Sequence, residues 1–265
     1  MDFEARKRDI VTHLALEESN ERDKSPKGYI DVPIVELMRL INGHADYVTT
    51  SSCSGRIAVY AEGEAEDDGC KTAKGGEWLY VTHERVGLPD KSMQEQCQWC
   101  LETVFGSSKV VSSGGSVLSP HQPLIYFKFE PLVLHVEASS AEAADSLTSI
   151  ALQVGYRNSG IIPSRTRHML AIRSTLKLDL PIAYRRNNII HLLVEPSYLL
   201  LLIHMSNAKF DQNLDRLQLL EDHVQQFLNK PPVESKQERR IRKQREGREK
   251  QLRLQALCQP FGKGV

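Results

Sequence analysis

The chain has 265 residues, 40% of them hydrophobic, and its 34 Lys and Arg balance 34 Asp and Glu. This size predicts one compact domain of about 200 residues with extensions, and the longest apolar run, Leu199 to Ile203, is far shorter than the ~18 residues that span a bilayer. With no secretory signal and five cysteines without disulfide spacing, we expect an intracellular, cytoplasmic protein with reduced thiols and no membrane partner.

The first third of the chain predicts a charged extension, a helix and two strands. Residues 1–22 are charged and form the extension. A helix is expected over 32–42, because Asp31 is a good N-cap and apolar residues follow at helical spacing. A polar turn then leads into a strand at 56–60, and an acidic loop at 61–76 separates this from a strand at 78–83.

The middle of the chain alternates helices and strands. A helix at 91–104 and a flexible loop at 112–123 are followed by two strands, 125–129 and 132–136, with Pro131 as a break or bulge between them. The next helix, 140–154, has Ser139 and Glu142 as a capping box. Further strands are expected at 168–174 and 189–194.

The C-terminal part is predicted to be helical. In residues 197–228, apolar residues recur every seven positions at Ile203, Phe210, Leu217 and Val224, which predicts a long helix that packs on the body or on a partner protein. Residues 233–256 are rich in Arg, Lys, Glu and Gln. A solvated or frayed helix is favoured there over an RNA-binding arm.

Two parts of the predicted order resemble each other. The helix at 32–42, its turn and the strand at 56–60 are echoed by the helix at 140–154, its turn and the strand at 168–174. We therefore expect an α+β fold with a mixed sheet built from two related α/β halves. The expected domains are the N-terminal extension 1–22, a catalytic α/β domain 23–195, a C-terminal helix 196–230 and a basic tail 231–265. No Gly-rich dinucleotide fingerprint is present, so a Rossmann-type site is not indicated.

Charge is unevenly distributed along the chain. Residues 231–265 hold ten Lys and Arg against four Glu, a net of +6, so residues 1–230 carry −6. Within that acidic body, residues 155–188 hold seven basic residues and one acid, Asp179. This cluster predicts a local anion-binding surface, with a solvated basic loop as the alternative.

The most unusual stretch is Thr49 to Arg56. Its small hydroxylic residues and Gly allow close backbone approach to a ligand, and an Arg side chain binds phosphate or carboxylate bidentately. A plain polar turn is the alternative, and no activating partner for Cys53 is evident. The candidate binding residues here are Ser52, Cys53, Ser54, Gly55 and Arg56.

Other candidate residues are dispersed. Lys128 and Glu130 share one strand face, where a cross-strand ion pair is the alternative. His135 and His83 titrate near neutral pH and are candidate bases, although a lone His among apolar residues is more often a core residue. Asn158, Ser159 and Gly160 form a second turn. The pair Cys97 and Cys100 lacks a second pair with zinc spacing, so we expect no metal site.

Six stretches taken together resemble the tRNA wybutosine-synthesizing protein 3 family, in order across residues 23–183. They are Asp23–Gly28, Thr50–Ile57, Trp78–His83, Phe127–Val136, Gly155–Ile161 and Met169–Ser174. The loops near 61–76 and 106–123 are long for the family core, and the tail beyond 229 matches nothing in it. Neither departure touches these stretches.

The resemblance implies an S-adenosylmethionine-dependent methyltransferase. Its substrate would be a tricyclic wybutosine precursor beside the anticodon of phenylalanine tRNA, methylated on a ring nitrogen. His135 would be the first candidate base, with Glu130 or His83 next. The turns at 52–56 and 158–160, with Lys128 and Arg173, would hold cofactor and base, while Lys24, Lys27, Arg157 and Arg167 would contact tRNA. The rival hypothesis is a non-catalytic module that presents the anticodon loop to another enzyme.

Overall fold

The computed structural model describes residues 2–20, 30–63, 75–112, 122–229 and 236–257. The elements in chain order are α1 (Phe3–Asn20), the 3-10 helix η1 (Val32–Ile34), α2 (Val35–Gly43), β1 (Tyr47–Ala61), β2 (Glu77–Thr82), α3 (Met93–Phe105), β3 (Val110–Ser112), β4 (Leu124–Ala138), α4 (Ala141–Gln153), β5 (Gly160–Ile162), β6 (His168–Arg173), β7 (Leu178–Arg186), β8 (Ile189–Leu192), α5 (Pro196–Leu228) and α6 (Lys236–Leu257). They form two units, Met1–Gln225 and Gln226–Val265.

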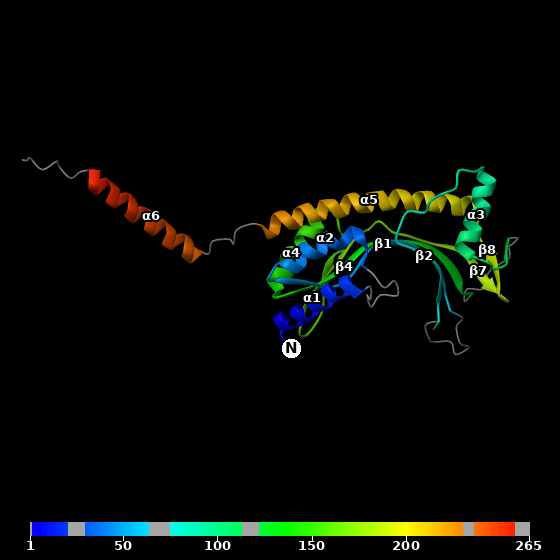
Figure 1. Cartoon of the computed structure of the whole chain (residues 1–265), viewed down its shortest axis with the longest axis horizontal. Coiled ribbons are helices and arrows are strands. Elements are labelled where there is room, and N and C mark those ends of the chain that lie inside the picture. Colours follow the sequence, from blue (N-terminus) through cyan, green and yellow to red (C-terminus); the bar gives the residue numbers. More distant parts are fainter. Residues whose placement is uncertain (1, 21–29, 64–74, 113–121, 230–235, 258–265) are drawn as a thin grey trace, which may run out of the picture. The chain divides into compact units, whose positions relative to one another are not determined.

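An eight-stranded sheet is the frame of the first unit (Figure 1). Its main path runs β2-β1-β4-β7-β8-β3. The long strand β4 pairs with β7 through its first half and with β6 through its second half, and β5 lies outside β6. Only β3 and β8 pair in parallel among the described strands, so the predicted mixed sheet is confirmed, and its order is not that of a doubly wound fold.

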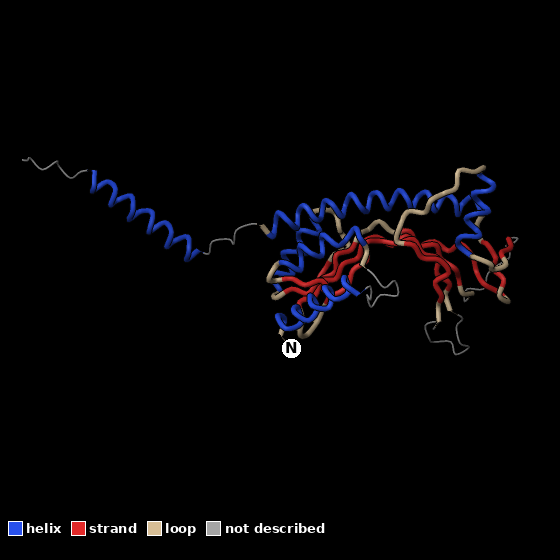
Figure 2. Tube along the Cα trace, viewed as in Figure 1, coloured by secondary structure: helices blue, strands red, loops and turns tan. Residues whose placement is uncertain are grey.

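The helices α2, α4 and α5 lie on one side of this sheet, and α1 lies on the other (Figure 2). The side chains that recur every seven residues in α5, namely Ile203, Phe210, Leu217 and Val224, are all buried, as predicted. The Phe210 ring meets the Phe129 ring of β4 edge-on, with 5.1 Å between the centroids. The long helix thus closes one face of the sheet and leaves the opposite face to carry a site.

Four local predictions were wrong. Residues 49–55 are not a turn but part of the fifteen-residue strand β1, because each end of the segment pairs with β4. The strand β4 continues through Pro131 without a break, since Pro131 pairs opposite Gly55. The N-cap of α4 is Ser140, whose hydroxyl accepts from the Ala143 N–H, and the neighbouring Ser139 donates to Asp46 instead. The strands β3, β5 and β7 were not predicted.

In the central strands β1 and β4, the alternation of side chains between the two faces of the sheet shifts by one residue at Gly55 and Pro131, which pair with each other. In β4 the odd-numbered residues from 125 to 131 are buried, and from 132 to 138 the even-numbered ones are, together with Glu137, which pairs with Arg6 of α1. In β1, the Ser52 hydroxyl reaches Met38 of α2, whereas a Cβ at Gly55 would lie 3.3 Å from the Asn213 amide nitrogen of α5. Gly55 has a φ of +128°, a conformation that side-chain-bearing residues avoid. The change keeps one face open along both strands.

Asn213 of α5 holds this point of the sheet. Its buried amide accepts from the Leu132 N–H at 2.9 Å and donates to the Ser54 carbonyl at 2.7 Å, so it joins β4 to β1 where their pleats shift. Replacing Asn213 by alanine would leave both backbone groups buried without these partners. We expect the free energy of unfolding to fall by about 2–4 kcal/mol, as measured by urea denaturation. The exposed neighbour Gln212 is the control, and Gln212→Ala should change stability by less than about 0.5 kcal/mol. Equal stability of the two variants would contradict the role given to Asn213.

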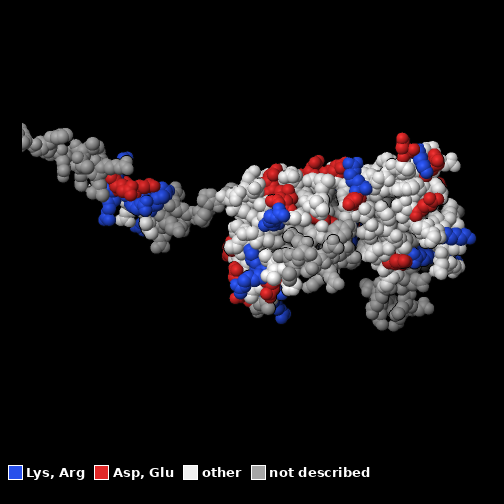
Figure 3. All heavy atoms as spheres, viewed as in Figure 1, with Lys and Arg blue, Asp and Glu red and all other residues white. Residues whose placement is uncertain are grey.

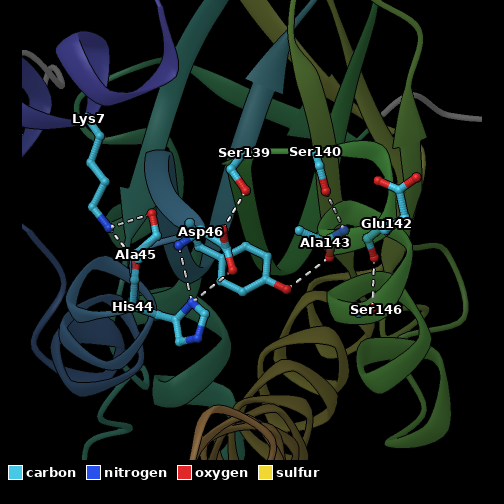
Figure 4. A network of polar contacts seen from close by, with 10 residues as sticks. Lys7, His44, Ala45, Asp46, Ser139, Ser140, Glu142, Ala143 and Ser146 are labelled. Atoms are coloured by element: carbon cyan, nitrogen blue, oxygen red, sulfur yellow. Dashed lines mark hydrogen bonds and ion pairs between the residues drawn. The ribbon is translucent and has the colours of Figure 1, made fainter. Parts of the chain in front are cut away.

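The N-terminal helix α1 is fixed to the sheet by ionic contacts. The Arg6 Nε donates to the carboxylate of Glu137 at 2.9 Å, and this carboxylate is fully buried. That hydrogen bond raises the pKa of Arg6. The Lys7 ammonium donates to the His44 carbonyl, while Asp46 and Ser139 join the adjacent ends of β1 and β4 (Figure 4). Helix α1, which the sequence predicted to be an extension, therefore packs on the open face of the sheet.

The second unit contains the last part of α5 and α6. Side chains 240–251 of α6 are exposed, and Arg242 pairs with Glu246 along the helix at 2.7 Å. This agrees with the prediction of a solvated helix. Within the described residues, no helix is long and apolar enough to cross a membrane.

A helix followed by an antiparallel pair of strands occurs twice, but not in the predicted correspondence: the sequence matched the strand at 56–60 (β1) with that at 168–174 (β6), and the structure places β5 between α4 and β6. Helix α2 precedes the antiparallel pair β1 and β2, and helix α4 precedes the antiparallel pair β5 and β6. The two copies meet through β4, which pairs with β1 on one side and with β6 on the other. The α+β class with a long C-terminal helix is confirmed.

Candidate functional site

A polar group centred on His135 lies on the open face of the sheet. Its Nδ1 is 2.8 Å from the Ser51 hydroxyl, opposite it on β1, and its Nε2 is 3.0 Å from the Arg173 guanidinium on β6. The Arg173 N–H in turn donates to the Ser159 hydroxyl at 3.1 Å. His135 is therefore not a core histidine but joins three strands on an accessible surface.

These contacts assign the protonation state of His135. Arginine only donates hydrogen bonds, so Nε2 must accept and the ring proton must reside on Nδ1, facing the Ser51 hydroxyl. Burial lowers the pKa of His135, and the positive charge of Arg173 lowers it further. The imidazole is neutral at neutral pH, which is the form that a general base requires.

The two segments predicted to form the walls of the site meet in one row of the sheet. Across four strands, Ser51 pairs opposite His135, His135 opposite Ala171, and Ala171 opposite Gly160. Gly160, at the end of the segment Asn158 to Gly160, therefore lies in the same row across the sheet as Ser51 of the Ser-rich segment Thr49 to Ser54. The sequence could not predict this meeting of the two segments, because they are about a hundred residues apart and their alignment depends on burial and strand register.

A second polar group surrounds Arg56. Its Nε donates to Glu130, the residue opposite it on β4, at 2.6 Å, and its guanidinium lies 4.7 Å from the centre of the Trp78 ring. Trp78 in turn contacts the Tyr60 ring at 4.9 Å and remains 45% exposed. An exposed aromatic ring beside a guanidinium is a surface that suits a flat, electron-rich ligand with a nearby negative charge.

Lys128 lies further along the same face and has protein partners. Its ammonium is 2.7 Å from Asp179, which also binds Lys177 at 2.7 Å. Burial opposes ionisation of Asp179, but the hydrogen bonds from the two lysines outweigh it and lower the pKa of that carboxyl. The cross-strand ion pair that the sequence offered as an alternative is present for both Lys128 and Glu130.

The candidate bases are separated along β4. His135 is five positions beyond Glu130, which corresponds to roughly 16 Å along a strand. They therefore cannot act on the same atom of one bound ligand. The His135 group and the Arg56 group are better described as two ends of one elongated site.

Between these two ends lies a cluster that sequence analysis did not assemble. One ligand atom each from Asp31, Cys53 and His83 lies within 4.8 Å of the other two. Asp31 is buried and accepts from the Ser54 N–H at 2.8 Å. Cys53, for which no activating partner was evident in the sequence, thus has a carboxylate and an imidazole beside it.

The structure places the predicted tRNA-binding residues in different surroundings. Lys24 and Lys27 lie outside the described residues. Arg157 is exposed in the turn after α4. Arg167 is 3.9 Å from the buried carboxylate of Glu137, which also pairs with Arg6 of α1. Within the described part of the basic segment 155–188, Arg185 pairs with Glu77 at 2.9 Å.

The charge of the molecular surface reflects these ion pairs between basic and acidic side chains. On the face of the molecule drawn in Figure 3, acidic and basic side chains of the first unit alternate in small groups, without one continuous basic field. A tRNA surface built from this face would depend on a few exposed arginines. Their contacts with phosphate would position the RNA without reading its sequence.

Sequence analysis missed Ser51, Trp78 and Asp31 as members of the site. Trp78 could have been recognised as an exposed aromatic residue in a strand next to the strand of Arg56. Asp31 was interpreted as a helix cap. Its side chain makes no cap hydrogen bond. In the Cys97 and Cys100 pair, Cys100 is fully buried, and its burial raises the pKa of that thiol to about 11, which disfavours the reactive thiolate.

Comparison with known proteins gives a consistent result. Residues 5–226 match the family model described as "Methyltransferase TYW3". The chain is 35% identical over 274 aligned positions to tRNA wybutosine-synthesizing protein 3 of Saccharomyces cerevisiae, with 96% of each chain covered. It is 34% identical to the Schizosaccharomyces pombe protein of the same name, with 87% of this chain and 90% of the relative covered.

A solved structure shares the fold. The PH1069 protein of Pyrococcus horikoshii superposes with a TM-score of 0.61 at 25% identity, and the match covers 84% of this chain and 96% of that one. The comparisons thus extend over both strands of the open face and over α5. They also include α1 from residue 5 onward.

Proposed function

The chain belongs to the TYW3 methyltransferase family, and we propose that it transfers a methyl group from S-adenosylmethionine to a ring nitrogen of the tricyclic wybutosine precursor in phenylalanine tRNA. Its family makes it a tRNA methyltransferase of wybutosine synthesis. The observation that carries the proposal is the open face of β1 and β4. There the Ser-rich segment and the Asn158–Gly160 segment meet beside a neutral histidine, His135.

The Arg56 end suits the nucleotide. The exposed Trp78 ring offers a stacking surface for the flat tricyclic base, and Arg56, which lies over that ring, offers donors to a carboxylate or phosphate. The aminocarboxypropyl chain of the precursor carries such a carboxylate. Glu130 keeps the guanidinium in place through a 2.6 Å hydrogen bond.

The His135 end suits the proton transfer. Methyl transfer from a sulfonium to nitrogen proceeds by in-line displacement, so alignment of donor and acceptor supplies much of the acceleration. When the acceptor nitrogen carries a proton, a base must take it. His135 fills that role once Nε2 exchanges its contact with Arg173 for the substrate.

The first test is titration calorimetry with S-adenosylmethionine, with and without phenylalanine tRNA that carries the unmethylated precursor. We expect the cofactor to bind and a methyl group to appear on the tRNA, detected by mass spectrometry of the nucleosides. The control is the same tRNA with unmodified guanosine at that position, which should remain unmethylated. Tight tRNA binding without cofactor binding or methyl transfer would instead support the anticodon-presenting module.

A further inference from the structure

The cluster of Asp31, Cys53 and His83 has the composition of a metal site. A thiol sulfur, an imidazole nitrogen and a carboxylate oxygen lie within 4.8 Å of one another. These three donor types are the ones that zinc selects in proteins. Calcium and magnesium require oxygen ligands, so the thiol and the imidazole disfavour them.

The distances fit a small ion. Bonds of about 2.0–2.3 Å in a tetrahedral site place ligand atoms about 3.3–3.8 Å apart. The ligand atoms therefore need to close by at most about 1.5 Å, a distance that small rotations about side-chain bonds can cover.

The backbone around the cluster supports such a site. Strand β2 pairs with β1 only from Ile57 to Ala61, so the edge of β1 beside Cys53 is free for other contacts. Asp31 occupies part of this edge by accepting the Ser54 N–H at 2.8 Å, and His83 follows directly on the last paired residue of β2, Thr82. A hydrogen bond that orients a carboxylate is the usual support for a metal ligand.

We propose that Asp31, Cys53 and His83 bind a zinc ion through one atom each. Three protein ligands leave the fourth tetrahedral position for water or for a nitrogen or oxygen of a bound ligand. Cys53 and His83 are both partly exposed, which gives such a ligand access. The ion would lie between the His135 group and the Arg56 group, on the strand that carries Ser51 and Arg56.

Metal binding by the full-length protein tests this without cofactor or tRNA. The protein is stripped with a chelator and titrated with zinc in competition with a chromophoric chelator. It is then loaded with cobalt, which reports thiolate ligation through a near-ultraviolet charge-transfer band. Thermal melting with and without zinc is a third readout, because an ion that binds only the folded state raises the Tm.

The matched variants are Cys53→Ser, His83→Ala and, as control, Cys97→Ser, since Cys97 is also a partly exposed free cysteine but lies in α3. We expect one zinc per chain and a cobalt–thiolate band in the wild type and in Cys97→Ser. Loss of a residue that only hydrogen-bonds to a metal ligand weakens metal binding about 10–100-fold. Each ligand variant should therefore bind zinc at least ~100-fold more weakly while keeping its far-ultraviolet circular dichroism.

Two results would overturn the proposal. One is zinc affinity that is the same in the wild type, Cys53→Ser and His83→Ala. The other is a cobalt band that disappears in Cys97→Ser and persists in Cys53→Ser, which would place the metal at α3. Neither result bears on methyl transfer, which is measured separately.

Discussion

Replacing Arg56 by alanine is expected to lower the rate of methyl transfer about 100-fold. The hydrogen bond to Glu130 uses the Nε of Arg56, and under the proposed function the terminal nitrogens bind a carboxylate or phosphate of the ligand. A charge-assisted hydrogen bond contributes about 1.5–3 kcal/mol, and about 2.7 kcal/mol corresponds to a factor of 100. The measurement is kcat/KM with precursor-containing tRNA, beside a thermal melt.

The control for this variant is Arg185→Ala. Arg185 also donates to a glutamate, Glu77, at 2.9 Å and is similarly exposed, with 37% of its side chain accessible against 32% for Arg56. It lies on β7, which pairs with β4 from Leu124 to Phe129 and so does not reach the positions of Glu130 and His135. We expect Arg185→Ala to keep nearly full activity. An equal loss in both variants would show that general surface charge, not the Arg56 group, accounts for the effect.

Replacing His135 by alanine is expected to lower the chemical step by roughly 100-fold to 10,000-fold, the range that a positioned base supplies. The pH dependence is more specific. Because burial and Arg173 lower the pKa of His135 below its usual 6.5, the ring is neutral at pH 7. It becomes protonated, and so inactive as a base, only as the pH falls through this lowered value. The single-turnover rate should therefore stay constant from pH 8 to 6.5 and decline below that.

Arg173→Leu provides the second half of this test. It removes a positive charge and the donor to Nε2, so the pKa of His135 should rise toward 6.5, although burial still lowers it. The acid limb of the rate profile should then move to higher pH. His191→Ala is the control, since His191 stacks on Tyr184 at 4.8 Å away from the site, and it should leave the profile unchanged. An acid limb that does not move in Arg173→Leu would remove His135 from the role of base.

Much of the fold followed from periodicity, because burial of one face leaves a regular pattern in the sequence. The long helix α5 is the best example, since Ile203, Phe210, Leu217 and Val224 are all buried at the spacing that predicted them. The strands were harder. Polar residues from Thr49 to Ser54 suggested a turn, yet they form a strand because the open face of a sheet accepts polar side chains and β4 supplies the pairing.

The sequence nominated most members of the candidate site but not the contacts among them. Composition and motif order pointed to Arg56, His135 and Arg173, while the contacts among them depend on strand register. A change of pleat phase inside both strands cannot be read from alternation alone, since two consecutive residues become buried. For that reason the opposite positions Ser51 and His135 were not paired beforehand, and Trp78 was treated only as part of a strand.

The paired change of pleat at Gly55 and Pro131 also constrains how such sequences diverge. The outward residues Ser51, Cys53 and Arg56 are spaced by two and then three positions, and their partners His135, Val133 and Glu130 repeat this spacing in reverse. Insertion or deletion of one residue in either strand would turn Arg56 or Glu130 into the core. A search for distant relatives should therefore require the two mirrored intervals together and tolerate variation in side-chain identity, because the spacing is the more constrained property.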